Sequence, residues 1–193
     1  MCRVLLYLGK QEVAIYDLLY GPNNSLAHQS YAPRLMHHIQ NLAGLGFCAW
    51  SKHSHDPHLP FYYKTIQLPF FDKNLYRLSK KITSNCVLAH IRGVAYSTNE
   101  VVSEQNVHPY KLDNTQLALA HNGSLAGMPK MKAVLSSLIK PDVFKNIRGT
   151  TDSEWIYAVF LSQIEDYTAH VSLEEATEAL MKTLIILRQT RIK

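Results

Sequence analysis

Short apolar runs separated by polar breaks dominate the first half of the chain. Residues 3–8 and 13–19 are two such runs, on either side of Gly9-Lys10, a pair typical of a turn. The runs at 46–50 and 85–92 have the length and composition of buried strands. We therefore expect a β-rich N-terminal region.

One more strand is predicted over residues 116–121, where it ends at Asn122-Gly123. Asn-Gly is the dipeptide that most strongly favours a two-residue hairpin turn. Polar segments at 21–25 and 52–58, the second interrupted by a proline, predict loops. The pattern up to residue 123 is therefore that of short strands joined by turns and loops.

Two later segments have a helical pattern. The first covers residues 153–164 and follows Thr151-Asp152-Ser153-Glu154, a capping-box sequence. Its apolar residues recur at helical spacing and define the face that we expect to be buried: Trp155, Ile156, Val159, Phe160 and Ile164.

The second predicted helix covers residues 173–188. It begins after Ser172 with two acidic residues in its first turn, and basic residues follow its end, which suits the helix dipole. The apolar stripe predicted for it consists of Ala176, Leu180, Leu184 and Leu187.

The composition is that of one globular domain covering residues 1–193. Of the 193 residues, 47% are apolar and 18% are charged, which argues against disorder and allows a sizeable core. The formal charge of +5 is spread over single basic residues and short pairs such as Lys80-Lys81, so no nucleic-acid surface is indicated.

The cysteines and the absence of targeting patterns indicate a reducing compartment. Cys2, Cys48 and Cys86 are an odd number without C-x-x-C spacing, which suggests neither a disulfide framework nor a zinc site. No signal-peptide pattern and no apolar run of membrane-spanning length occurs. We expect a soluble cytoplasmic protein that binds neither nucleic acid nor membrane.

A cysteine directly follows the initiator methionine at the start of an apolar run. The small side chain of Cys2 permits removal of Met1, after which Cys2 carries a free α-amine beside its thiol. An amine that titrates at about 7.7 to 8.0 can take the thiol proton and so generate the nucleophilic thiolate. The alternative is that Cys2 is a small buried residue without chemistry, as many free cysteines are.

Four further motifs follow Cys2 in the chain. They are Leu88-Ala89-His90-Ile91-Arg92, Glu104-Gln105-Asn106-Val107-His108-Pro109-Tyr110, Leu119-Ala120-His121-Asn122-Gly123-Ser124-Leu125 and Arg148-Gly149-Thr150-Thr151-Asp152-Ser153-Glu154. In this order behind an N-terminal cysteine, they resemble the glutaminase domain of class II glutamine amidotransferases, the cysteine branch of the N-terminal nucleophile (Ntn) hydrolases. The opening Met1-Cys2-Arg3 and residues 44–50 are most similar to the single-domain type 2 amidotransferase-like proteins, which include γ-glutamyl hydrolases.

The resemblance covers residues 2–165 and implies an α+β fold. That fold is a four-layer α/β/β/α sandwich of the Ntn-hydrolase type, which we expect to be incomplete at the C-terminal end. Because the family domain continues with further strands, the helix predicted from residue 173 is expected to lack part of the sheet that it covers.

A γ-glutamyl substrate presents an α-carboxylate and an α-ammonium group. The resemblance assigns Arg92 to the carboxylate, for which a bidentate guanidinium is suited, and Asp152 to the ammonium. The alternatives are a surface ion pair for Arg92 and a helix N-cap for Asp152, and capping does not exclude ligand binding.

The resemblance also implies an oxyanion hole formed by the side-chain amide of Asn122 and the backbone N–H of Gly123. Such donors stabilise the tetrahedral intermediate of acyl transfer, and a hairpin turn at this place is compatible with that role. The family pattern places His108 near the rim of the substrate pocket; a structural hydrogen bond is the alternative.

Two departures from the family pattern concern the surroundings of this site. Leu45-Gly46 stands where family members often have Asp-Gly, and the interval from Arg92 to His108 is a few residues longer, with the insertion around residues 96–101.

Two groups of histidines are candidate metal ligands. His53, His55 and His58 with Asp56 have zinc-like spacing, but the family reaction uses no metal, and we interpret this group and His37-His38 as solvated loops. The resemblance implies no cofactor.

The expected function is hydrolysis of a γ-glutamyl amide, either glutamine or a γ-glutamyl compound. The reaction passes through a γ-glutamyl thioester on Cys2 and releases glutamate and ammonia or an amine. Transfer of ammonia would require a separate synthase or hydrolase subunit as partner. The alternative is a non-catalytic γ-glutamyl-binding or scaffold protein derived from this fold.

Overall fold

The computed structural model describes residues 2–35, 40–94 and 100–192. The predictions about Met1 and His37-His38 lie outside the described residues, and so do residues 96–99 of the insertion predicted around 96–101. The chain forms two compact units. Unit 1 comprises Met1–Pro109 and Ala120–Asn122, and unit 2 comprises Tyr110–Leu119 and Gly123–Lys193. The assignment of residues 1–193 to one domain stays a prediction.

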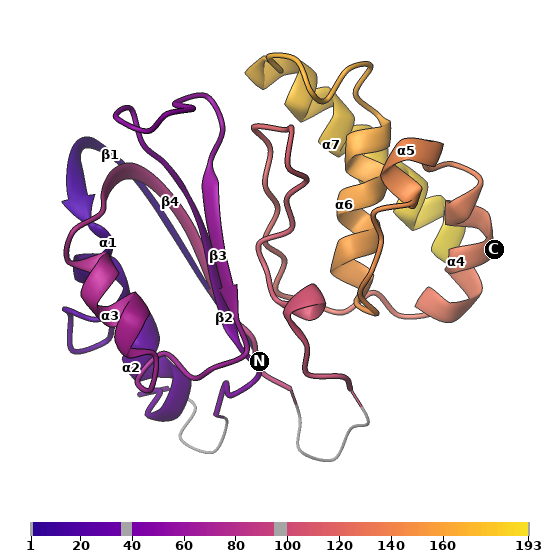
Figure 1. Ribbon diagram of the computed structural model, residues 1–193. Coiled ribbons are helices and arrows are strands. Elements are labelled where there is room, and N and C mark those ends of the chain that lie inside the picture. Colours follow the sequence, from indigo (N-terminus) through magenta and orange to yellow (C-terminus); the bar gives the residue numbers. More distant parts are fainter. Residues whose placement is uncertain (1, 36–39, 95–99, 193) are drawn as a thin grey trace. The chain divides into compact units, whose positions relative to one another are not determined.

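A four-stranded antiparallel sheet forms the centre of unit 1 (Figure 1). In the order of the sheet, the strands are β1 (Arg3–Ala14), β4 (Thr83–Ile91), β2 (Leu45–Trp50) and β3 (Phe61–Thr65). An antiparallel sheet with helices outside it is the expected α+β arrangement. The four-layer sandwich stays a prediction.

Three short helices cover one face of this sheet (Figure 1). They are α1 (Ile15–Leu19), α2 (Leu26–Tyr31) and α3 (Lys73–Ser79); a single 3-10 turn, η1 (Glu104–Asn106), also belongs to unit 1. The covered face carries Val87, Ala89 and Ile91 of β4, all fully buried. Side chains alternate along a strand, so His90 belongs to the opposite face.

The predicted turn at Gly9-Lys10 is wrong. Strand β1 continues through both residues to Ala14, with a shift in its pairing to β4 between Leu8 and Val13. The second apolar run, 13–19, is divided between the end of β1 and helix α1. A short apolar run alone does not distinguish a strand from a helical turn, and here the run contains both.

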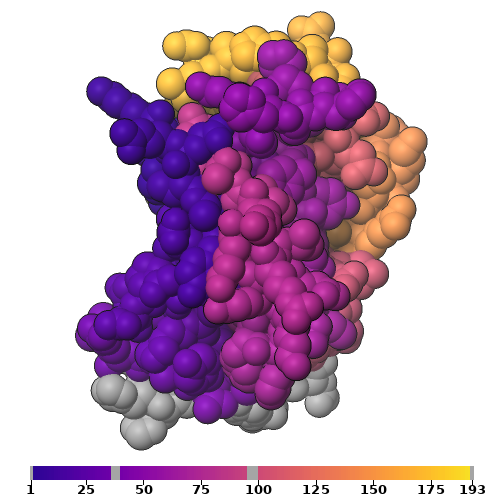
Figure 2. Space-filling view, turned by 60° about the vertical axis from the view of Figure 1, so that its left-hand side comes forward, coloured from indigo at the N-terminus to yellow at the C-terminus, as the bar shows by residue number. Residues whose placement is uncertain are grey.

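Strand β1 lies at the edge of the sheet, and its indigo atoms follow the left side of the view in Figure 2. Val4, Leu6 and Leu8 are exposed, and they alternate with the partly buried Leu5 and Tyr7 that pack on the helix-covered core. Alternation therefore places Cys2 on the same face as Val4, the face that carries His90.

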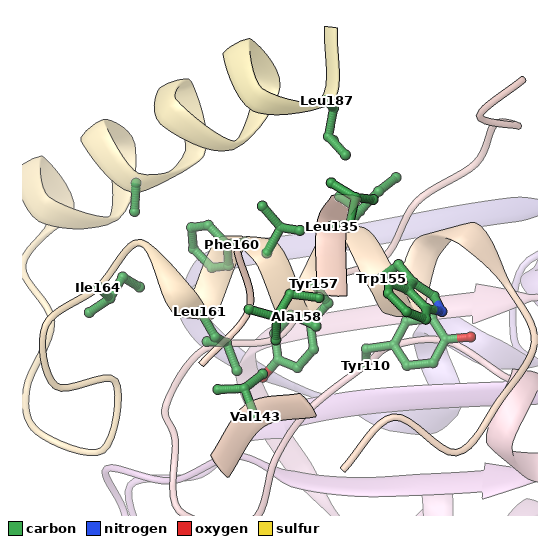
Figure 3. Packing of buried hydrophobic residues seen from close by; sticks show 14 of the residues in the cluster. Tyr110, Leu135, Val143, Trp155, Tyr157, Ala158, Phe160, Leu161, Ile164 and Leu187 are labelled. Carbon is green, nitrogen blue, oxygen red and sulfur yellow. The ribbon is translucent and has the colours of Figure 1, made fainter. Parts of the chain in front are cut away.

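Unit 2 is helical. Its helices are α4 (Met128–Ser136), α5 (Pro141–Phe144), α6 (Asp152–Ser162) and α7 (Leu173–Ile192). Figure 3 shows the apolar cluster that joins them, with α6 at its centre. Leu135 of α4, Val143 of α5 and Leu187 of α7 all contribute buried side chains.

The helix predicted over 153–164 is confirmed as α6, one residue earlier at its start. Thr151 is its N-cap, and the Thr151 hydroxyl accepts a hydrogen bond from the N–H of Glu154 at 3.3 Å. Residues 153–161 are all buried. The helix is therefore buried on all sides, and the expectation of one apolar face was too narrow.

Helix α7 confirms the second predicted helix, and Ser172 caps its start by accepting from the N–H of Glu175 at 3.1 Å. The predicted stripe is partly wrong. Ala179, Thr183 and Leu187 are buried, whereas Leu180 and Leu184 are 41% and 51% exposed.

The error in the α7 stripe has a simple cause. Ala179, Thr183 and Leu187 are spaced four residues apart and therefore share a face. That face packs against α4 and α6. Because the helix also has apolar residues next to this face, periodicity alone did not select the side that packing buries.

The strand predicted over 116–121 and its hairpin turn do not form. Only one isolated bridge, between Tyr110 and Leu119, occurs in this segment. Side chains of unit 2 hold it instead: the Tyr157 hydroxyl donates to the Leu117 carbonyl at 2.9 Å, and the Gln116 amide donates to the Val171 carbonyl at 2.9 Å. These contacts satisfy polar groups that a strand partner would otherwise engage.

Within the described ranges, none of the helices has both the length and the apolar character needed to cross a membrane.

Candidate active site

Cys2 directly precedes β1 and lies beside Gly93, the second residue after β4. The N–H of Gly93 lies 3.4 Å from the Cys2 sulfur, and the thiol donates to the Gly93 carbonyl at 3.7 Å. The side chain is half-buried, and all three cysteines are free thiols. The backbone of Gly93 thus contacts the sulfur, and Cys2 as a residue is only partly buried.

Asn122 reaches Cys2 although 120 residues separate them in the chain. Its side-chain amide Nδ2 donates to the Cys2 carbonyl at 3.0 Å, and Arg3 Nη1 donates to the same oxygen at 3.1 Å. Two residues of the predicted site are thereby brought together within unit 1. Gly123 belongs to unit 2, and its predicted role stays a prediction.

Arg92 follows the last residue of β4 and is buried, with 4% of its surface exposed. Its Nη1 donates to the Val101 carbonyl at 2.8 Å, and its Nη2 lies 3.3 Å from a carboxylate oxygen of Glu100. Asn106 Nδ2 donates to the same Val101 carbonyl at 3.0 Å. The arginine is therefore a buried cation whose ion-pair partner is exposed.

Asp152 is the first residue of α6, not its N-cap. The cap is Thr151, because its hydroxyl takes the Glu154 N–H. The Asp152 carboxylate accepts from the backbone N–H of Leu125 at 2.5 Å and from the Ser153 hydroxyl at 3.2 Å. Asp152 belongs to unit 2, and its role toward a substrate ammonium stays a prediction.

His108 is buried, with 4% of its surface exposed, and its ring lies against that of His90. The two ring centroids are 4.2 Å apart, and the ring planes make an angle of 38°. His90 is fully buried between Val4 of β1 and Gly46 of β2. His108 thus packs against His90, and its place at the rim of a substrate pocket stays a prediction.

Gly46 of β2 and Gly44, which directly precedes β2, leave room for the segment that carries His108. A Cβ at Gly46 would overlap the carbonyl oxygen of His108, and a Cβ at Gly44 would lie 2.7 Å from both the Thr65 carbonyl and the Val107 side chain. Gly44 also has φ of +113°, which side chains disfavour. Leu45, between them, is fully buried in the helix-covered core. Leu45 therefore faces away from His108.

Burial keeps both histidines neutral. It lowers the pKa of His90 to about 3, with smaller contributions in the same direction from Arg92 and His121. Burial likewise lowers the pKa of His108 to about 2, assisted by His90, His121, Lys64 and Arg92. Within the described residues, neither ring nitrogen of His90 has a hydrogen-bond partner that would offset the cost of a buried charge.

Replacing His90 with leucine should reduce the loss of stability in acid. The pKa of His90 is lowered in the folded chain, so its stabilising effect is complete above about pH 6.5 and is lost as pH falls toward 3. Between pH 7 and pH 5, unit 1 of the His90→Leu variant should therefore lose about 2 kcal/mol less than the parent.

Urea unfolding followed by Trp50 fluorescence measures this effect in unit 1. A Trp155→Phe background removes the second tryptophan, which lies in unit 2. Equal slopes of stability against pH in parent and variant would contradict the buried neutral state of His90.

The histidine group at 53–58 is solvent-exposed. His53 lies 4.0 Å from Glu12, and His55 lies 3.9 Å from Asp56, in both cases as exposed imidazoles. Among the described residues, no cluster of three or more metal-binding side chains occurs. The loop prediction for this segment is confirmed.

The sequence-based prediction did not include three contributors to this region. Gly93 supplies the backbone groups at the sulfur, His90 packs on His108, and Glu100 pairs with Arg92. Strand alternation gave a signal for His90, because it stands two residues before Arg92 in the strand predicted over 85–92 and so on the same face of that predicted strand. No local pattern pointed to Glu100.

A solved structure has a similar fold. A glutamine aminotransferase class-II domain protein from Silicibacter pomeroyi matches 96% of this chain and 62% of its own with a TM-score of 0.60, at 16% sequence identity. The fold is therefore of the Ntn type expected from the motifs.

The sequence matches the family model for class-II glutamine amidotransferases over residues 69–190. The chain belongs to this family.

Two curated relatives are also similar. The probable glutamine amidotransferase DUG3 of Saccharomyces cerevisiae is 33% identical over 170 residues, 86% of this chain and 46% of the yeast protein. The γ-glutamyl-hercynylcysteine sulfoxide hydrolase of Mycobacterium tuberculosis is 32% identical over 124 residues, 64% of this chain and 49% of that enzyme. The chain thus spans about half the length of these relatives.

Proposed function

We propose that this protein hydrolyses γ-glutamyl amides with Cys2 as the nucleophile. The thiolate attacks the δ-carbonyl carbon, the carbon–nitrogen bond breaks, and ammonia or an amine leaves with a proton. Water then cleaves the γ-glutamyl thioester, which releases glutamate and restores the thiol. Removal of Met1 is part of the proposal, because the α-amine of Cys2 is the base that takes and returns the proton.

The observation that supports the proposal most strongly is the hydrogen bond from the Asn122 side-chain amide to the Cys2 carbonyl. The Asn122 amide donor lies beside the nucleophilic residue, 3.0 Å from its carbonyl oxygen, and in the proposed reaction it donates to the substrate oxygen that becomes the oxyanion when the sulfur attacks the carbonyl carbon. The half-buried sulfur beside Gly93 leaves one side for a substrate. Arg92, a buried guanidinium one residue before Gly93, is the proposed partner of the substrate carboxylate.

The relatives support the substrate class. One is named as a glutamine amidotransferase and the other as a hydrolase of a γ-glutamyl compound. Glutamine is itself a γ-glutamyl amide, so both names refer to a substrate with a γ-glutamyl group. We propose that the substrate of this protein also contains a γ-glutamyl group. Transfer of released ammonia to a separate synthase or hydrolase subunit stays a prediction.

Labelling with 6-diazo-5-oxo-norleucine tests the proposal. This glutamine analogue should add once per chain, at Cys2, and peptide mass spectrometry should locate the adduct. The intact mass should show loss of Met1. Glutamate release should be assayed with glutamine and with glutathione, because the ratio of the two rates separates a glutaminase from a γ-glutamyl peptide hydrolase.

Two controls make this test specific. The Cys2→Ala chain should take no label, whereas the Cys86→Ala chain should label like the parent, because Cys86 pairs with Leu8 of β1, six residues along the chain from Cys2. A chain that binds the analogue without reacting, or that retains Met1, would favour the alternative of a non-catalytic γ-glutamyl-binding protein.

A further inference from the structure

We infer that Glu100 is a built-in competitor of the substrate for Arg92 and thereby sets the affinity for the substrate α-carboxylate. This inference rests on the proposed function, in which Arg92 binds that carboxylate. The inference goes beyond the proposed function because it names Glu100 as a residue that the substrate displaces.

The geometry shows one carboxylate already at the guanidinium. Glu100 Oε2 lies 3.3 Å from Arg92 Nη2, and the Val101 carbonyl accepts from Nη1 at 2.8 Å. A carboxylate that binds end-on needs one N–H from each terminal nitrogen of the fork, and these two contacts already use one N–H on each. A carboxylate that approaches this end of the guanidinium therefore competes with Glu100 for Nη2.

The two partners of the ion pair differ in burial, which makes Glu100 the one that can leave. The Arg92 side chain is 5% exposed, whereas that of Glu100 is 59% exposed. The displaced glutamate returns to water at little cost, but the guanidinium stays in a buried place and needs a new anion. The substrate supplies that anion.

The Val101 carbonyl has a different role from Glu100. It accepts from both Arg92 Nη1 and Asn106 Nδ2, and Asn106 is fully buried on η1. These contacts keep the guanidinium in place when Glu100 leaves. Glu100 thus contributes a displaceable charge, and the backbone contributes the fixed position.

The size of the effect follows from the exposure of the pair. Pairs with one exposed partner contribute little free energy, so removing the competing carboxylate should tighten carboxylate binding about two- to fivefold. A larger gain is not expected, because the competitor is screened by solvent. The gain should appear only for ligands that have an α-carboxylate.

Ligand binding by the full chain carrying Cys2→Ala tests the inference without turnover. Isothermal titration with glutamine should give a dissociation constant about two- to fivefold lower after Glu100→Gln. Glutaminamide, in which an amide replaces the α-carboxylate, should bind no tighter after the same substitution. Glu104→Gln, which removes an equal charge from an exposed position on η1, should leave glutamine binding unchanged.

The other outcomes overturn the inference. Weaker glutamine binding after Glu100→Gln would show that Glu100 orients Arg92, and equal tightening of both ligands would show a general charge effect. Absence of glutamine binding in both chains would also overturn it. Labelling of Cys2 in the unmodified chain then shows separately whether the proposed function fails as well.

Discussion

Inserting one alanine between Met1 and Cys2 should lower the rate of glutamine hydrolysis by about 10²- to 10⁴-fold, the usual contribution of a positioned general base. The insertion leaves the thiol in the chain but converts its α-amine to a peptide nitrogen, which cannot accept a proton. It tests the amine separately from the sulfur. Initial rates of glutamate release by the two chains give the comparison.

A cleavable extension provides the matched control. An N-terminal tag whose protease site ends directly before Cys2 should be inactive before cleavage and should regain the parental rate afterwards. Circular dichroism before and after cleavage should be identical, because the sheet pairing of β1 begins at Arg3. Full activity of the uncleaved chain would remove the α-amine from the mechanism.

The fold was predictable where local pattern and tertiary packing agree. The strands at 46–50 and 85–92 correspond to β2 and β4, and the capping residues Thr151 and Ser172 mark the true starts of α6 and α7. Caps are reliable because the hydrogen bonds that they make are local.

Prediction failed where distant residues decide the structure. Residues 116–121 have the composition of a strand, but Tyr157 and Gln116 hydrogen bonds engage this segment without a strand partner. The Asn-Gly turn failed for the same reason, since a hairpin needs two pairing strands and neither flank forms one. On α7, the buried side was selected by α4 and α6 and not by the helix's own periodicity.

The candidate site likewise contains residues that sequence motifs identify and residues that only the folded structure reveals. Cys2, Arg92 and Asn122 were identified through ordered motifs, and the structure brings Asn122 to Cys2 by a hydrogen bond that no sequence spacing specifies. Glu100 was missed because one acidic residue in a polar loop has no pattern. Its significance depends on the direction in which the Arg92 side chain points.

Replacing Gly46 with alanine should destabilise unit 1 by about 2 to 4 kcal/mol, as overpacking against immobile atoms does. The added Cβ would overlap the His108 carbonyl and lie 3.1 Å from the Tyr63 carbonyl. Both obstacles are backbone atoms, so rotation of a side chain cannot relieve the clash. Either β2 or the 107–108 segment must move, and His108 would separate from His90.

Urea unfolding followed by Trp50 in the Trp155→Phe background measures this loss. Gly21→Ala is the matched control, because its added Cβ would approach no atom closer than 3.4 Å, and it should change the free energy of unfolding by less than about 0.5 kcal/mol. If Gly46→Ala were as stable as that control, the 107–108 segment would not lie on β2 as described. A large loss of unfolding free energy in Gly46→Ala but not in Gly21→Ala would show that His108 can lie on the sheet because residue 46 has no side chain.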